Sequence, residues 1–256
     1  MSPLPTIDST ARTIDEVVER LTTIIDWSRE SHSRLGYFAA LYRKVTVSVG
    51  DGIDNDDFED GARMERLDVT FANRYLQALI DQERGVAPTR VWSFTFESAE
   101  AYWPIVLQHL MLGMNAHINL DLGIAAAETM RGESLEELHA DFDKINEILV
   151  SLVGGVQQEL ADVWLTLRLF NVLLGSVDDA LIGFSMEGAR DEAWRTAATF
   201  WGAPESEWPP MIRRQDDKML SLARLIRQPG IVLGAVTRIV RLGEVRDIAR
   251  VIDILA

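Results

Sequence analysis

The chain has 256 residues, no cysteine and a formal net charge of −15, and hydrophobic residues make up 47% of it. This composition is typical of a globular protein and the length suits one hydrophobic core, so we expect a single domain over residues 1–256. The acidic balance argues against nucleic-acid binding, and the missing cysteines exclude disulfides, thiolate metal ligands and a cysteine nucleophile. The sequence has neither an apolar run long enough for a membrane span nor a secretory signal pattern, which predicts a cytoplasmic protein with no integral membrane segment.

Positive charge gathers near the C-terminus. Residues 211–256 hold nine Lys or Arg and five Asp or Glu, a net charge of +4, so the first 210 residues carry −19. We expect the C-terminal arginines to pair mostly with acidic residues of the body; these are Arg238, Arg241, Arg246 and Arg250. The alternative is that the segment recognises an anionic ligand or an anionic membrane.

Apolar residues recur at intervals of three and four along most of the chain, which predicts amphipathic helices. In chain order, the predicted helices lie near residues 14–25, 38–49, 67–79, 98–130, 134–153, 156–174, 177–186, 188–201, 214–227, 231–241 and 243–255. Ser98 is expected to cap the fourth helix, with Pro104 kinking it or setting its true start. Ser134 and Glu137 form a capping-box pattern at the fifth. The run RVWSFTF resembles a short strand without a partner, so the predicted fold is an all-α multi-helix bundle.

The loop GDGIDNDDFEDG is the densest acidic stretch of the chain. Its spacing does not match the calcium-binding EF-hand loop. We expect Asp56 or Asp57 to cap the helix that follows, and the alternative is that one of these aspartates completes a metal site.

The stretch LQHLMLGMNAHINLDLG places His117 and Asp121 in a helix that is apolar on all sides. A buried polar group costs several kcal/mol in an apolar medium unless it finds a partner. The same His-x-x-x-Asp spacing recurs at His139 and Asp143, and residues four apart project from one stripe of a helix. If the two helices face each other, the four side chains can hold one metal ion, with zinc the first expectation and manganese or iron next.

Further candidates surround this pair. His109 lies about 12 Å along the helix axis from His117, too far to bind the same ion, so we expect it near the substrate. Gly113 lies between them and leaves room for a neighbouring helix or a ligand. For Asn115 and Asn119 we expect hydrogen bonds to neighbouring helix ends, with substrate binding as the alternative, and for Trp92 and Trp103 the alternative to a substrate pocket is a place in the core. The candidate substrate-binding residues are Trp92, Trp103, Asn115, Asn146 and Arg190, and Asn119 accompanies Asn115.

Four stretches resemble a family of bacterial and fungal proteins known only as a domain of unknown function. They are MLGMNAHINLDL, LYRKVTVSV, FANRYLQAL and DFDKIN. The resemblance covers most of the chain and implies an all-helical domain with no established activity.

The two His-x-x-x-Asp helices are also distantly similar to the zinc-dependent phospholipase C and single-strand nuclease superfamily. Those helical enzymes bind a cluster of zinc ions, and His117, Asp121, His139 and Asp143 match their paired helices in residue type and spacing. The resemblance implies a phospholipase C-like bundle. The chain departs from the pattern because it begins Met-Ser-Pro instead of with a zinc-binding Trp and has fewer histidines. A full three-zinc site is therefore not expected, and fewer metals or none are the alternatives.

These observations support three hypotheses of function. The leading one is a metal-dependent hydrolase of an ester or phosphoester, in which the metal lowers the pKa of bound water. In it, His117 and Asp121 are the principal ligands, His139 and Asp143 are ligands or acid–base groups, and His109 lies near a small-molecule substrate. The second is a metal-free cyclase, lyase or isomerase for an apolar small molecule, with the buried His–Asp pair as acid and base. The third is a non-enzymatic helical binding protein with a buried hydrogen-bond network.

Overall fold

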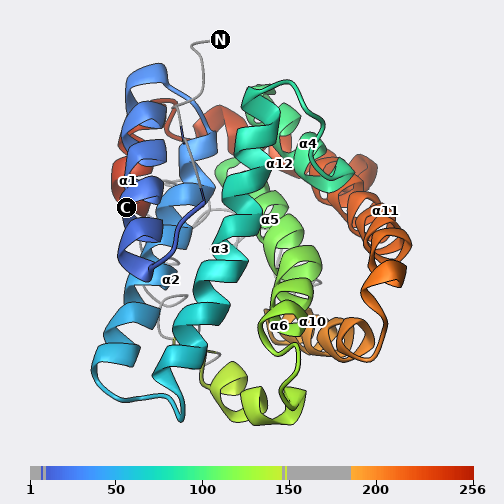
Figure 1. Cartoon of the computed structure of the whole chain (residues 1–256). Helices are drawn as coiled ribbons and strands as arrows, with labels where there is room; N and C mark the ends of the chain where they lie inside the picture. Colours follow the sequence, from blue (N-terminus) through green and yellow to red (C-terminus); the bar gives the residue numbers. More distant parts are fainter. Residues whose placement is uncertain (1–6, 8–9, 146–147, 149–185) are drawn as a thin grey trace.

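The computed structural model describes residue 7, residues 10–145, residue 148 and residues 186–256. Within these residues the chain contains helices and no strand, which confirms the all-α prediction (Figure 1). Residues 139–145 are helical as well. The helices are α1 (Ile14–Ser31), α2 (Leu35–Asp54), α3 (Gly61–Glu83), α4 (Arg90–Glu100), α5 (Val106–Met114), the π-helix η1 (Asn115–Leu122), α6 (Gly123–Thr129), the 3-10 helix η2 (Leu135–Leu138), α10 (Met186–Trp201), the 3-10 helix η3 (Glu205–Glu207), α11 (Trp208–Arg227), α12 (Gly230–Gly243) and α13 (Ile248–Leu255).

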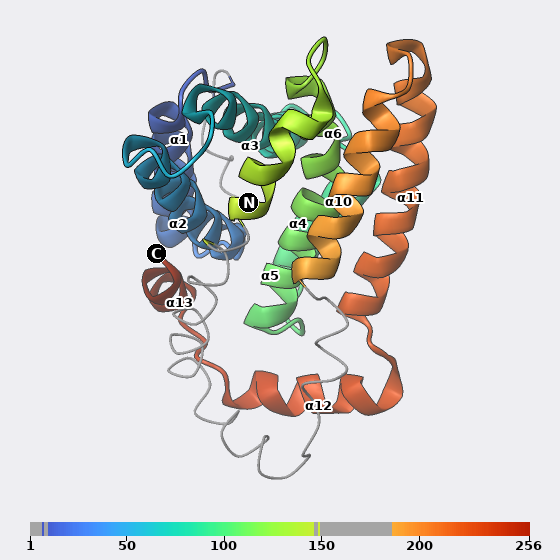
Figure 2. The same ribbon diagram turned by 90° about the horizontal axis from the view of Figure 1, so that it is seen from below.

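The helices are arranged around a central rod. α5, η1 and α6 follow one another without a break from Val106 to Thr129 and form this rod. α1, α2 and α13 pack together on one side of the molecule, and α10 and α11 lie on the other (Figure 2). α12 runs along one edge between these two groups (Figure 2).

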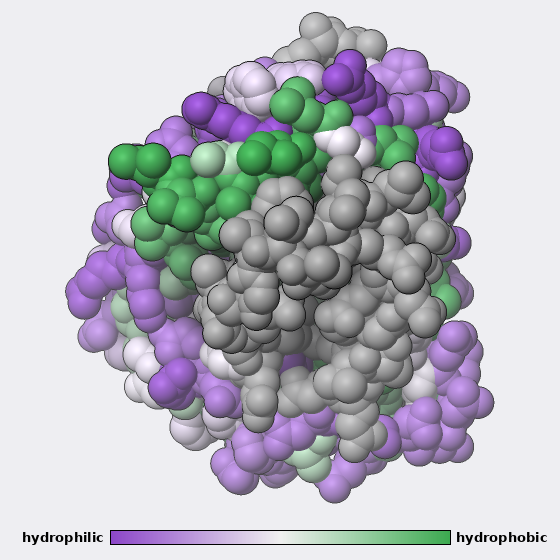
Figure 3. Space-filling model, turned by 180° about the vertical axis from the view of Figure 1, so that it is seen from behind, coloured by the Kyte–Doolittle hydropathy of each residue, from purple (hydrophilic) through white to green (hydrophobic). Residues whose placement is uncertain are grey.

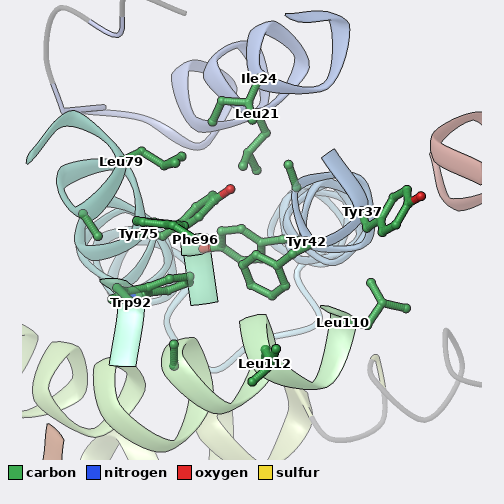
Figure 4. Packing of buried hydrophobic residues seen from close by; sticks show 14 of the residues in the cluster. Leu21, Ile24, Tyr37, Tyr42, Tyr75, Leu79, Trp92, Phe96, Leu110 and Leu112 are labelled. Carbon is green, nitrogen blue, oxygen red and sulfur yellow. The ribbon is translucent and has the colours of Figure 1, made fainter. Parts of the chain in front are cut away.

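Other helices pack around the rod, which accounts for the apolar residues on all its sides. Helices α2, α3, α4, α10 and α11 all contact some part of it. As a result, every residue from 115 to 127 is buried, polar ones included. The burial expected for this helix from its sequence is therefore confirmed. Figure 4 shows how Tyr42, Tyr75 and Trp92 gather between the surrounding helices and the rod.

The start of the rod differs from the predicted helix over residues 98–130. Ser98 does not cap it; this residue belongs to α4 and its hydroxyl donates a hydrogen bond to the carbonyl of Phe94 at 2.6 Å. The rod begins at Val106, two residues after Pro104, which agrees with the expectation that the proline marks the true start. RVWSFTF forms most of α4, because packing against α5 and α11 overrides its strand-like composition.

The residue that caps α3 is also different from the prediction. Asp60 accepts a hydrogen bond from the backbone N–H of Arg63 at 2.9 Å, so it is the N-cap, and not Asp56 or Asp57. Asp56 adopts a left-handed backbone conformation, with φ of 55°, in the turn after α2. An aspartate at this position tolerates such a turn better than most residues do.

The expected capping box of Ser134 and Glu137 is not formed. Ser134 precedes a short 3-10 helix, and its side chain makes no capping hydrogen bond. The helices predicted over 156–174 and 177–186, and the end of the helix predicted over 134–153, lie outside the described residues.

The C-terminal helices follow the predicted order with shifted ends. α11 begins at Trp208, six residues earlier than predicted, because proline is well tolerated in the first turn of a helix. Within the described residues, no single helix is both long and apolar enough to cross a membrane. The segment Glu205–Arg227 and α12 meet those criteria only when joined, and they are bent by 60° at their junction.

Replacing Gly113 with alanine is expected to destabilise the protein by about 1–3 kcal/mol, because a Cβ there has no room. It would lie 2.5 Å from the ring of Phe38, which is itself packed against other rings. Gly234→Ala in α12 is the matched control, since a Cβ there meets nothing within 4 Å. Helix propensity predicts that this control gains about 0.5–1 kcal/mol. Denaturant unfolding measures both changes, and equal stability of the two variants would contradict the close contact of α2 with α5.

Candidate functional site

The central part of the rod, Asn115–Leu122, is a π-helix. Such segments are rare and are frequently found at functional sites. Both His117 and Asp121 lie in it, and each side chain is only 2% exposed. The structure therefore places the most polar part of the rod in one of the most deeply buried parts of the molecule.

Asp121 is held by two donors from two other helices. Its Oδ1 accepts a hydrogen bond from Nε of Arg74 on α3 at 2.9 Å, and its Oδ2 accepts one from Nε1 of Trp92 on α4 at 2.8 Å. Burial by itself raises the pKa of this carboxyl, but the charge of Arg74 and the hydrogen bonds bring the pKa below its usual value. Asp121 is therefore a buried, ionised carboxylate at neutral pH.

The imidazole of His117 is enclosed by aromatic rings. It stacks parallel to Phe71 with centroids 3.6 Å apart, and the ring of Tyr42 meets it edge-on at 4.4 Å. Three further rings surround it at 5.6 to 6.2 Å: Phe38, Tyr75 and Trp92. Such an apolar enclosure excludes water, and aromatic faces can stabilise a cation placed against them.

Within the described part of the chain, neither nitrogen of His117 has a hydrogen-bond partner. Its Nδ1 lies 3.7 Å from Oδ2 of Asp121, which is longer than a hydrogen bond. Burial lowers the pKa of this imidazole, and Asp121 opposes that shift only in part, so His117 is neutral at neutral pH. The site thus pairs a neutral base with a charged carboxylate.

Two more buried polar groups lie near this pair. The hydroxyl of Tyr42 and Oδ2 of Asp68 both lack a hydrogen-bond partner among the described residues. Burial, and to a lesser extent the charge of Glu65, raises the pKa of Asp68 to about 7. Burial raises the pKa of Tyr42 well above its usual value, and the charges of Asp68 and Asp121 add to this rise. This phenol is therefore protonated and lies within electrostatic reach of both carboxylates.

The second His–Asp pair is at a different place. His139 and Asp143 are 45% and 59% exposed, with His139 Nε2 3.9 Å from Asp143 Oδ2, and the His139 ring packs against Trp194. The buried carboxylate of this segment is Asp141, which accepts a hydrogen bond from the backbone N–H of Glu59 at 2.6 Å. The sequence-based expectation that both His–Asp pairs converge is therefore not met.

His109 is separate from both pairs. It is 6% exposed and meets Tyr37 of α2 edge-on, with ring centroids 5.8 Å apart. Burial, together with the charges of nearby arginines that include Arg34, lowers its pKa to about 3, so it is neutral. It shares no ring neighbour with His117 among those described, since the contacts of His117 are with Phe38, Tyr42, Phe71, Tyr75 and Trp92.

The asparagines of the rod connect it to α11. Asn115 donates a hydrogen bond to the carbonyl of Met219 at 2.9 Å and accepts one from Asn119 at 3.0 Å. Gln215 of α11 donates in turn to the carbonyl of Asn119 at 3.0 Å. These contacts explain the asparagines as structural, which agrees with the expectation of hydrogen bonds to a neighbouring helix.

Of the other predicted substrate-binding residues, one lies at the site and the others that the structure describes lie elsewhere. Trp92 is at the site, as the donor to Asp121, whereas Trp103 is 53% exposed on the surface. Arg190 is buried, donates to the carbonyl of Phe142 and covers the ring of that residue, with its guanidinium carbon 4.2 Å from the ring centroid. Asn146 lies outside the described residues.

The donors around Asp121 fit a metal ion poorly. Both of its oxygens already accept N–H groups, and one of those donors is the cationic side chain of Arg74. In the part of the chain that the structure describes, no group of three or more His, Cys, Asp or Glu side chains is arranged to hold an ion. A zinc, manganese or iron site stays a prediction that these residues do not support.

A model described as "Family of unknown function (DUF5995)" matches residues 14–229. The chain belongs to this family. The matched span contains Arg74, Trp92, His117 and Asp121 and ends one residue before α12. Comparisons with curated proteins and with solved structures found no match. The predicted membership of an uncharacterised helical family is thus confirmed, whereas the phospholipase C-like detail remains a prediction.

Sequence reasoning missed four residues of the site: Tyr42, Asp68, Phe71 and Arg74. Phe71 and Tyr75 belong to the apolar stripe that predicts the helix near residues 67–79, and Arg74 stands beside that stripe. One signal in the sequence could have pointed to Arg74. It is a charged residue next to an apolar stripe, and a buried carboxylate such as Asp121 requires a cation as its partner.

Replacing Arg74 with methionine is expected to destabilise the protein by roughly 3–5 kcal/mol, because Asp121 then remains buried without its cation. Arg66→Met on the same helix is the matched control. Arg66 is 50% exposed and pairs at 3.5 Å with Glu133, which is equally open to water, so its loss is expected to cost about 0–1 kcal/mol. Urea unfolding at neutral pH compares the two variants. Similar stability losses would show that the Arg74–Asp121 pair contributes no more than a surface ion pair.

Asp68 is expected to make the free energy of unfolding decrease as the pH rises from about 4 to 7. The reason is that its pKa of about 7 in the folded protein lies above the value of roughly 3.9 in an unfolded chain. The folded protein then holds one more proton than the unfolded chain over this range, so raising the pH favours unfolding. Asp68→Asn removes this dependence and is expected to gain up to about 4 kcal/mol relative to wild type at pH 8. Unfolding free energies between pH 4 and 8 test this. A wild-type profile parallel to that of the variant would contradict it.

Proposed function

We propose that this protein is a metal-free lyase, isomerase or cyclase that transfers a proton of a small apolar molecule through His117. The observation that carries the proposal is the state of this imidazole. It is neutral and buried, its two nitrogens find no partner among the described residues, and it lies beside an ionised carboxylate. A buried polar atom without a partner costs about 1–3 kcal/mol, so two such atoms in one ring favour a role in binding or reaction.

The chemistry that suits this arrangement is proton abstraction next to a carbonyl. The neutral imidazole accepts the proton, and the electron pair of the broken C–H bond moves into the carbonyl to give an enolate. Asp121 and the face of Phe71 stabilise the imidazolium that forms. Returning the proton to another atom yields an isomer, and departure of a leaving group yields an elimination product.

Asp121 acts in this scheme as an orienting group. Arg74 and Trp92 fix its two oxygens, so that the carboxylate stands in one position relative to the ring of His117. The distance of 3.7 Å between Nδ1 and Oδ2 is long, but hydrogen bonds of this kind often shorten only when a ligand is bound. In this scheme the protonated hydroxyl of Tyr42, whose ring contacts the imidazole, donates a hydrogen bond to the oxyanion of the enolate.

The surroundings of His117 favour a neutral, largely apolar substrate. The enclosing side chains of the described residues are aromatic, and the cationic Arg74 is already matched by Asp121. Phe71 stacks on the imidazole and is only partly buried, whereas the other four described rings around His117 are buried. Displacing Phe71 is therefore the route by which we expect the substrate to enter.

The metal-dependent hydrolase receives less support from the geometry. It uses His139 and Asp143 as further ligands or as acid–base groups, but these side chains are 45% and 59% exposed, and the His139 ring packs against Trp194 and not against the rings around His117. For this reason the metal-free alternative is the one that we propose.

The test is deuterium incorporation into a panel of small apolar ketones, aldehydes and enones in D2O, followed by mass spectrometry. The wild-type protein treated with a chelator is expected to accelerate exchange of the proton next to the carbonyl in at least one compound. Loss of a general base typically lowers a rate by about 10²–10⁴-fold, and we expect a decrease of that size for His117→Gln.

His139→Gln is the matched control, because it removes the other histidine of the same motif at an exposed position. This variant is expected to exchange at the wild-type rate. Exchange that survives in His117→Gln, or that the chelator abolishes, would show that another group or a metal carries the reaction. If no compound exchanges with the wild-type protein, a carbon acid of this kind is not the substrate and the proposal fails in this form.

A further inference from the structure

Helix α12 turns its most apolar face toward solvent. Ile231 and Val232 are 93% and 81% exposed, and Ile239 and Leu242 follow at 57% and 60%. These positions are spaced as one stripe of a helix. A band of hydrophobic residues is visible on this side of the molecule (Figure 3). Most surface helices of globular proteins show the opposite arrangement.

The orientation of α12 is fixed by polar contacts on its inner face. Arg241 is buried, pairs with Glu244 at 2.7 Å and donates to the carbonyl of Tyr102, also at 2.7 Å. The carboxylate of Glu244 in turn accepts a hydrogen bond from the backbone N–H of Val106, the first residue of the rod, at 2.9 Å. The helix cannot roll to bury its apolar stripe without breaking the hydrogen bonds of Arg241 with Tyr102 and of Glu244 with Val106, so the outward apolar face is built into the structure.

Two aromatic residues border the stripe. Tyr102 and Trp103 are 46% and 53% exposed. The guanidinium carbon of Arg241 lies 4.8 Å from the centroid of the Tyr102 ring, and that of Arg238 lies 5.7 Å from the centroid of the Trp103 ring. The α12 patch is defined here by its six exposed members: Tyr102, Trp103, Ile231, Val232, Ile239 and Leu242. Trp, Tyr and Arg beside aliphatic side chains are typical of protein surfaces that lie at the interface of a membrane.

The charge of this region has the opposite sign to that of the rest of the chain. Residues 224–250 contain six arginines and two acidic residues, a net charge of +4, whereas the whole chain carries −15. An anionic surface therefore attracts this region and repels the remaining body, so that the molecule approaches with α12 foremost.

We propose that the α12 patch binds an anionic lipid surface, with α12 lying along the headgroups and its aliphatic side chains entering the acyl boundary. A second copy of the chain fits less well. A two-fold contact through the patch would place its arginines near each other and bring two chains of net charge −15 together. The proposal is independent of the reaction at His117, since no member of the α12 patch is among the described ring and hydrogen-bond partners of His117 and Asp121.

The experiment is co-sedimentation of the full-length protein with vesicles. Vesicles of phosphatidylcholine and phosphatidylglycerol in equal amounts are compared with vesicles of phosphatidylcholine alone. The wild-type protein is expected to bind the mixed vesicles at least about tenfold more tightly, and to lose affinity as salt is raised, because exposed charges are screened.

The variant Ile231→Ser with Val232→Ser removes the two most exposed members of the patch and is expected to weaken binding to mixed vesicles by at least about tenfold. Both side chains are more than 80% exposed, so circular dichroism and the melting temperature are expected to stay at wild-type values. Val86→Ser is the control, because Val86 is 55% exposed in the turn after α3, outside the patch, and its replacement is expected to leave binding unchanged.

Three results would overturn the proposal. They are no binding to either kind of vesicle, equal binding of the double variant and wild type, or equal affinity for neutral and anionic vesicles. If sedimentation velocity shows a wild-type dimer that the double variant abolishes and vesicles bind neither protein, the patch is an interface between two copies instead.

Discussion

The buried carboxylate of Asp121 is the constraint on which the arrangement of the central helices depends. A charge in so apolar a place remains ionised only if donors are fixed around it, and these come from α3 through Arg74 and from α4 through Trp92. The three elements are therefore joined at one point, and the aromatic rings between them pack around the neighbouring His117. Asn115, another polar group of the rod, finds a partner on α11, whereas neither nitrogen of His117 finds one among the described residues.

Much of the fold follows from helical periodicity, and the sequence of the rod also predicts that His117 and Asp121 are buried, as they are in the structure. The partners of Asp121 did not follow from the sequence, because Arg74 and Trp92 are 47 and 29 positions away and no local pattern records a contact between distant helices. The apolar stripe of α3 is apparent in the sequence, but nothing in the sequence shows that its rings pack against the imidazole of His117.

The second His–Asp motif shows how a spacing rule can mislead. The spacing of His139 and Asp143 is correct for a shared ligand, but it does not specify which side of the helix faces inward. Asp141, two positions from each, is the buried residue, and its contacts with the N-terminus of α3 and with Arg63 turn the motif toward solvent. Arg241 also departs from the expectation for the C-terminal arginines, because it pairs with Glu244 of its own segment and not with an acidic residue of the body.

The π-helix changes the directions in which the side chains of α6 point relative to those of α5. In an α-helix each residue advances the direction of the side chains by about 100°, so one additional residue in the Asn115–Leu122 turn offsets α6 relative to α5 by that amount. With this offset α6 presents Gly123 to α10, where a Cβ would stand 2.6 Å from the carbonyl oxygen of Ala193. Without it, a larger side chain would face α10 and the two helices would be held apart. The segment that carries His117 and Asp121 thus also sets the angular register in which the outer helices dock, so a change in its length would alter packing far from the imidazole.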